Sequence, residues 1–185
     1  MRRFGLCQFL GALSLALLLA GCGGPTTPQA ALQQQFALQG QNPRIYPFHD
    51  NLARGYRLYF LDLPGSTIPS PTAAILHRYQ GNWLVTQYVS IPYISGCRKP
   101  IAVSFGGLMA VGALTGRRQI AVGRIEGSAA VGSLVYSLGT EQSNATLLRD
   151  GFWLAPLVLP SVNLNAPVQI SLHDAAGRQI PACFF

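Results

Sequence analysis

Cysteine, histidine and acidic side chains are the groups in this chain that could carry nucleophilic or acid–base chemistry. The 185 residues include four cysteines, three histidines and only six acidic residues. Two of the histidines stand beside an aspartate, in the pairs His49-Asp50 and His173-Asp174. Adjacent side chains of a strand point to opposite faces, so neither pair can by itself supply a base and its orienting carboxylate. No spacing of these residues is typical of a metal site, and the sequence therefore predicts no catalytic residue, no metal and no cofactor.

Cys97 and Cys183 form an even pair once Cys7 and Cys22, which belong to the leader considered below, are set aside. In an exported domain such a pair is typical of a disulfide. This bridge would close a loop of roughly 85 residues and contribute about 4–5 kcal/mol at most in the chain-entropy model. The alternative is a nucleophilic Cys97, whose basic neighbours could favour the thiolate. The surrounding Ser-Gly-Cys segment resembles the cysteine motif of L,D-transpeptidases but lacks that family's histidine between serine and glycine. We therefore favour the disulfide.

Two pairs of basic residues lie in predicted loops, at Arg98-Lys99 and at Arg117-Arg118. They are candidates for contacts with anionic headgroups or a cell-wall polymer, the alternative being solvated loop charges. The formal net charge is +7 and falls by two, to +5, when Arg2 and Arg3 leave with the leader. A charge this diffuse does not indicate a nucleic-acid partner.

The first residues of the chain have the layout of a secretory leader. Arg2 and Arg3 precede an apolar run from Phe9 to Ala20, which leads through Leu19-Ala20-Gly21 into Cys22. The run is about a dozen residues long, which suits the apolar region of a signal peptide. A membrane-spanning helix needs roughly 20 apolar residues, so the leader is too short to be one.

This leader resembles the lipobox signal peptide of bacterial lipoproteins. The resemblance implies export, transfer of diacylglycerol to the Cys22 sulfur, cleavage before Cys22, and acylation of the new amino terminus by a fatty acid such as palmitate. Two or more acyl chains hold a protein stably on a membrane. Gly23 differs from the aspartate that retains enterobacterial lipoproteins in the inner membrane, so the expected address is the periplasmic side of the outer membrane. The resemblance covers the leader alone.

The sequence divides into a signal peptide (1–21), a lipidated cysteine with a tether (22–45), and a single β-rich domain (46–185). Ala30 to Leu38 is helix-compatible and predicts a short helix within the tether. Gln80-Gly81-Asn82 has the composition of a hairpin turn. Strands are expected at 56–61, 74–79, 83–91, 101–105, 108–114, 119–125, 129–138 and 168–173.

The predicted fold class is all-β, an antiparallel sandwich, with a barrel as the alternative. Apolar runs about 10 residues apart favour this class. Glycines interrupt the stretch Leu108–Leu138, which we interpret as successive hairpins because each glycine would weaken a helix by up to ~1 kcal/mol. A pair of helices packed through glycines is the competing interpretation. Val168–His173 alternates strictly between apolar and polar residues, and Asp174–Gly177 predicts a turn into a final hairpin that carries Cys183.

These observations predict a monomeric envelope lipoprotein with a non-enzymatic role in binding, scaffolding or assembly. Its expected partners are the membrane and an envelope protein or cell-wall polymer. The alternative is an envelope enzyme that acts on peptidoglycan or glycan. A cleft with clustered histidine and carboxylate groups would favour the enzyme, and an aromatic groove without titratable groups would favour the binding protein. The aromatic residues of the expected strands are candidates for a sugar- or peptide-binding face, or for the core: Tyr56, Tyr59, Phe60, Tyr79, Trp83, Tyr88, Phe152 and Trp153.

Overall fold

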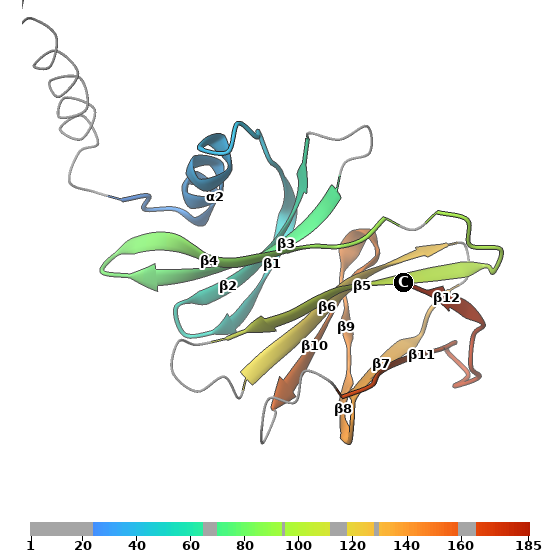
Figure 1. Ribbon diagram of the computed structural model, residues 1–185. Helices are drawn as coiled ribbons and strands as arrows, with labels where there is room; N and C mark the ends of the chain where they lie inside the picture. The colour runs from blue at the N-terminus through green and yellow to red at the C-terminus, as the bar shows by residue number, and fades with distance from the viewer. Residues whose placement is uncertain (1–23, 65–69, 94, 112–117, 128–129, 159–165) are drawn as a thin grey trace, which may run out of the picture.

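The computed structural model describes residues 24–64, 70–93, 95–111, 118–127, 130–158 and 166–185, without the side chains of residues 47–51 and 70. This part of the chain is mostly β-strand (Figure 1). The described elements are α2 (Pro28–Ala37), β1 (Arg44–Ala53), β2 (Tyr56–Leu63), β3 (Ser70–Tyr79), β4 (Asn82–Ser90), β5 (Ile101–Ala110), β6 (Arg118–Gly127), β7 (Ser133–Leu138), β8 (Glu141–Asn144), β9 (Thr146–Leu147), the 3₁₀ turn η1 (Arg149–Gly151), β10 (Phe152–Val158), β11 (Val168–His173) and β12 (Ala182–Phe184).

The described strands form three sheets, ordered β1-β2-β3-β4, β12-β5-β6-β10-β9 and β11-β7-β8. Every described pair of neighbouring strands is antiparallel except β12 and β5, which run parallel. None of these sheets closes on itself. The predicted all-β sandwich is therefore confirmed. It contains three sheets, whereas a sandwich usually has two.

The five-stranded sheet lies in the middle of the sandwich and is buried on both faces. Along β10, Trp153 and Ala155 pack in one core with the three-stranded sheet, whereas Phe152 and Leu154 pack in a second core with the four-stranded sheet. A strand buried on both faces has apolar residues at successive positions rather than at alternate ones. This explains why β5, β6 and β10 appear in the sequence as continuous apolar runs.

Helix α2 covers the outer face of the four-stranded sheet. Thr27 caps its first turn, where the side-chain oxygen accepts a hydrogen bond of 3.2 Å from the Ala30 N–H. Ala31, Leu32 and Phe36 are buried in a third core, against residues of β2, β3 and β4. The predicted helix is confirmed, but it belongs to the packed domain. Residues 28–37 therefore pack on the four-stranded sheet, whereas the sequence placed the helix within the tether.

The stretch predicted as successive hairpins departs from that pattern at two points. β5 joins two predicted runs into one strand, with a register shift between Phe105 and Gly107 that marks a bulge. After β6 the chain leaves the central sheet, because β7 pairs with β8 and β11 while β6 pairs with β10. The prediction of successive hairpins is therefore wrong beyond β6. The described residues of this stretch are strands and irregular chain, and residues 112–117 and 128–129 lie outside the described part.

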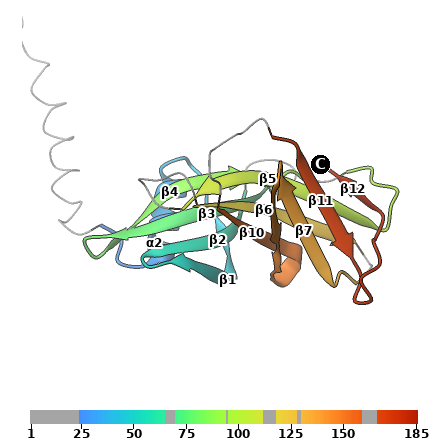
Figure 2. The same cartoon turned by 90° about the horizontal axis from the view of Figure 1, so that it is seen from below.

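The C-terminal hairpin is shorter than predicted. β11 forms as expected, and the Ile180 N–H still donates to the Leu172 carbonyl beyond the turn. The chain then crosses to the central sheet, where β12 pairs parallel with β5. Figures 1 and 2 place β11 and β12 at one end of the molecule and α2 toward the other. The helices that the structure describes are all too short or too polar to cross a bilayer.

Candidate functional site

A groove opens at the end of the molecule that carries β11 and β12, with a volume of about 670 Å³. This volume is within the usual range for ligand pockets. We call it the aromatic–amide groove. Its lining residues are Phe105, Ser137, Gln142, Val168, Gln169, Ile170, Ser171, Gln179, Phe184 and Phe185.

Three phenylalanines supply the aromatic wall, and strand pairing fixes their positions. The Phe185 N–H donates to the Val103 carbonyl at 3.0 Å, and the Phe105 N–H donates to the Phe185 carbonyl at 2.9 Å. The Phe105 ring packs on the buried Tyr136, with ring centroids 5.6 Å apart. Phe184 and Phe185 are 49% and 51% exposed. These two half-exposed rings are therefore accessible to a molecule that enters the groove.

Amide and hydroxyl side chains supply the polar part of the groove. Ser137 of β7 pairs with Gln169 of β11 on one side and with Gln142 of β8 on the other. Directly opposed residues share a face of the sheet, so these three side chains form one row across three strands. Ser171 and Gln179 extend the polar lining. Each of these groups can both donate and accept hydrogen bonds, and the described lining contains no ionisable side chain.

The predicted disulfide between Cys97 and Cys183 is confirmed, with Cα atoms 6.0 Å apart. Cys183 lies in β12, directly before Phe184, and Cys97 lies in the loop before β5. The Lys99 ammonium group donates to the Ala182 carbonyl at 3.0 Å, which adds a second link to the same strand. The bridge therefore holds the aromatic wall in place, and a bridged Cys97 is not a free nucleophile.

The basic residues predicted to contact anions are not brought together. Arg98 and Lys99 are exposed before the start of β5, whereas Arg118 is exposed beside its far end, where its carbonyl accepts from the Val111 N–H. A strand of this length spans about 30 Å. Arg98 and Lys99 therefore share no patch with Arg118, and Arg117 lies outside the described residues.

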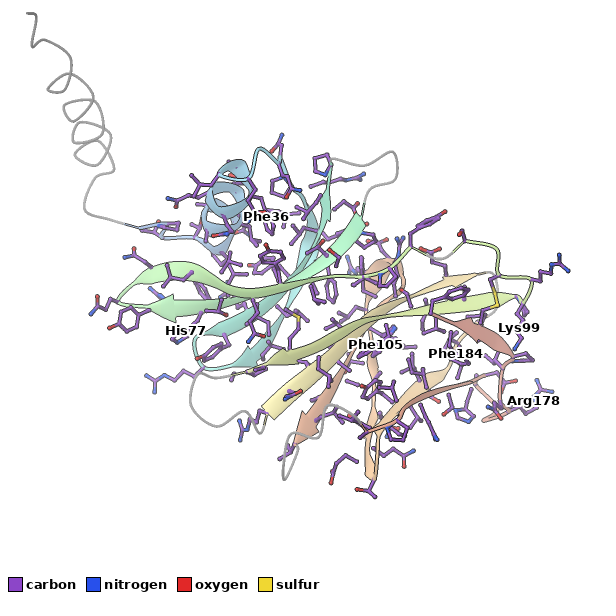
Figure 3. All side chains as sticks on the ribbon, viewed as in Figure 1. Phe36, His77, Lys99, Phe105, Arg178 and Phe184 are labelled. Atoms are coloured by element: carbon purple, nitrogen blue, oxygen red, sulfur yellow. A yellow bond between two sulfur atoms is a disulfide. The ribbon has the colours of Figure 1, made fainter. Side chains whose placement is uncertain are left out.

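The two histidines whose side chains are described, His77 and His173, lie in different sheets. His77 stacks on Tyr56 with ring centroids 4.2 Å apart, and Figure 3 shows it toward the opposite end of the domain from Phe184. His173 lies in β11. His49 and Asp50 lie in β1, but their side chains are outside the described part. Among the described residues, no three histidine, cysteine or acidic side chains gather to hold a metal.

The side-chain hydrogen bonds described for Asp174 lie within the turn that follows it and do not involve the neighbouring His173. Its carboxylate accepts hydrogen bonds from the backbone N–H groups of Ala176 and Arg178 and from the Arg178 guanidinium. These contacts, the Arg178 backbone N–H first, lower the pKa of Asp174. Asp174 thus has a structural role in the turn that follows β11, whereas His173 is the last residue of that strand.

Sequence reasoning missed the phenylalanines of the groove. Of the aromatic candidates, Tyr59, Phe60, Trp83, Phe152 and Trp153 are buried. The signal that could have found the groove is Phe184-Phe185, two large apolar residues directly after a bridged cysteine. Nothing in the sequence links them to Gln142 or Gln169, since the pairings that bring these residues together are long-range.

Comparison of the chain with protein-family models, curated proteins and solved structures gives no match.

Proposed function

We propose that this protein is an envelope lipoprotein, anchored through Cys22, whose aromatic–amide groove binds a neutral glycan chain. One observation carries the proposal. The groove combines half-exposed phenylalanine rings with amides and hydroxyls, and no ionisable side chain is present in its described lining.

The chemistry of the lining favours a glycan over a peptide. Sugar hydroxyls donate and accept hydrogen bonds, as do the side chains of Gln142, Gln169 and Gln179. The C–H faces of a sugar ring are apolar and suit the rings of Phe184 and Phe185. An uncharged lining also favours an uncharged ligand, because burying an unpaired charge is costly.

The same lining favours binding over cleavage. Hydrolysis of a glycosidic bond usually requires two carboxyl groups that flank the bond. The described lining offers no aspartate, glutamate or histidine to act as a general acid or base. The proposed role is therefore retention of a polymer, which agrees with a binding or scaffolding module.

The arrangement of the domain supports a ligand in the envelope. The described chain enters at Gly24 and Pro25, beside β4, where the Trp83 N–H donates to the Pro25 carbonyl at 2.8 Å. Figure 1 shows the β3–β4 turn and the groove strand β12 at opposite ends of the molecule. With Cys22 in the membrane, the groove would face away from the bilayer.

Calorimetric titration with uncharged oligosaccharides tests the proposal. The chain of residues 22–185 with Cys22→Ser contains α2, all the described sheets and both bridged cysteines, and it carries no lipid. We expect it to bind β-1,4-linked N-acetylglucosamine oligomers or a neutral glucan. Phe184→Ala should weaken binding about tenfold, since loss of a central aromatic contact costs about 1–2 kcal/mol.

Tyr93→Ala is the matched control, because Tyr93 is 51% exposed and lies outside the groove. This variant should bind as the parent chain does. Equal loss in both variants, or binding of unmodified peptides in preference to every neutral oligosaccharide, would contradict the glycan assignment. Release of shortened oligosaccharides would instead support the enzyme alternative.

A further inference from the structure

A second depression, of about 720 Å³, lies at the end of the domain where the described chain begins. We call it the basic depression. It is formed by the turn between β1 and β2 together with the adjoining ends of β3 and β4. Its lining includes Arg54, Gly55, Arg57, Arg78 and Trp83.

Backbone and ring contacts hold the basic side chains around this depression. The Arg78 N–H donates to the Gly55 carbonyl at 2.7 Å, which ties the β1–β2 turn to β3. The Arg57 guanidinium lies 4.9 Å from the centroid of the Trp83 ring. Arg54 and Arg78 are exposed on either side. The arrangement presents three guanidinium groups from one small area.

These three arginines lack an acidic partner among the described side chains. The salt bridges of the described residues join Arg124 to Glu126 and Arg178 to Asp174. The described lining of the basic depression contains no aspartate or glutamate. Guanidinium groups are well suited to bind phosphate, because their planar donors can contact two oxygens at once.

The point where the chain enters lies beside this depression. The Pro25 carbonyl accepts from the N–H of Trp83, which is a lining residue, and Gly24 lies against the side chain of Asn82. Cys22 stands two residues before Gly24, and two residues of extended chain span at most ~7 Å. A lipid on Cys22 would therefore hold the bilayer surface within about one Debye length, ~8 Å, of this edge of the domain.

We infer that the basic depression docks on the phosphate groups of anionic lipids in the bilayer that holds the anchor. The inference rests on the lipid anchor of the proposed function, and not on the groove. Each arginine at an anionic surface increases membrane partitioning about fivefold. Docking would fix the orientation of the domain, with the aromatic–amide groove directed away from the membrane.

Sedimentation with vesicles tests this inference on the chain of residues 22–185 with Cys22→Ser. We expect binding to vesicles that contain 30% phosphatidylglycerol and no measurable binding to phosphatidylcholine vesicles. Arg54→Gln combined with Arg78→Gln should weaken the binding about 25-fold, the product of two fivefold effects. Arg57 is left in place because it packs on Trp83.

Arg98→Gln combined with Arg149→Gln is the matched control, since it also removes two exposed positive charges. This control variant should bind the vesicles as the parent chain does. Phe184→Ala should also leave vesicle binding unchanged, so that failure of the lipid inference can be distinguished from failure of the glycan proposal. Equal loss in the two double variants would overturn the inference in favour of diffuse net charge. Displacement from the vesicles by inorganic phosphate, beyond that by sodium chloride of equal ionic strength, would overturn it in favour of a site for free phosphate.

Discussion

Gly123 of β6 lies directly opposite Trp153 of β10, and its backbone is covered by the indole ring. A Cβ atom at this position would come within 2.5 Å of the ring and would also clash with the Ser104 carbonyl oxygen. Trp153 is fully buried in the core between the central and three-stranded sheets. The absence of a side chain at Gly123 is therefore what allows this tryptophan to fill the core.

Gly123→Ala should destabilise the domain by about 3 kcal/mol, because an extra methyl group in a packed core displaces backbone and ring. Urea unfolding measures the change. Gly40→Ala is the control, because a Cβ atom added at Gly40 would have no other atom within 4 Å. Alanine is unfavourable there only because the backbone has a φ angle of +71°. That change should cost about 1 kcal/mol. Similar losses in the two variants would contradict the steric argument.

Replacing both bridged cysteines, by Cys97→Ser with Cys183→Ser, should lower the free energy of unfolding by up to about 4–5 kcal/mol. The bridge joins residues 86 positions apart, and β12 has only three paired residues to hold it without the bridge. Unfolding midpoints with and without reductant provide the measurement. Hydrogen exchange should also show faster exchange at the Phe185 N–H. Identical midpoints would show that the bridge contributes nothing.

Tyr136→Phe should stabilise the domain by about 1 kcal/mol at neutral pH. The Tyr136 hydroxyl is buried without a hydrogen-bond partner among the described residues, and removing such a group relieves a desolvation cost. Burial raises the pKa of Tyr136 to about 12. An unfolded tyrosine loses its proton near pH 10, whereas the buried hydroxyl keeps its proton up to about pH 12, so the free energy of unfolding is unaffected by this group below pH 10 and falls as the pH rises from 10 to about 12.

The alkaline loss of stability should therefore be smaller in Tyr136→Phe than in the parent protein. Urea unfolding at pH 8, 10 and 11 compares the two. A parallel decline in both proteins would mean that other groups cause the alkaline destabilisation. Tyr79→Phe, at a tyrosine that is 56% exposed, is the control for loss of a hydroxyl group and should not stabilise the domain at pH 8.

Cys22→Ser should release the protein from the membrane fraction in a high-salt wash, because the acyl chains at this residue would supply the part of its membrane affinity that salt does not screen. Mass spectrometry of the parent protein should find an acylated amino-terminal Cys22. The double variant of Cys97 and Cys183 should remain in the membrane fraction if it folds. A mature protein that begins at another residue and lacks lipid would contradict the anchor.

The sequence was sufficient where the determinants are local. Gln80 and Gly81 adopt positive φ angles of 49° and 88°, as the predicted turn between β3 and β4 requires. The alternation of Val168–His173 identified β11 because side-chain direction in a strand has a period of two. The cysteine count identified the bridge, since only one intramolecular pairing is available to the two cysteines that lie outside the predicted leader.

Only the tertiary structure decided which strands pair and where the sites form. Apolar periodicity indicates that a segment is buried, but it does not specify its neighbour, so the sequence could not show that β12 pairs parallel with β5 or that β7 leaves the central sheet. The groove depends on those pairings, because they bring Gln142, Gln169 and Phe184 to one end of the molecule. The basic depression likewise depends on the pairing of β2 with β3, which places Arg57 and Arg78 around Trp83. Residues far apart in sequence become a site through contacts that local propensities do not encode.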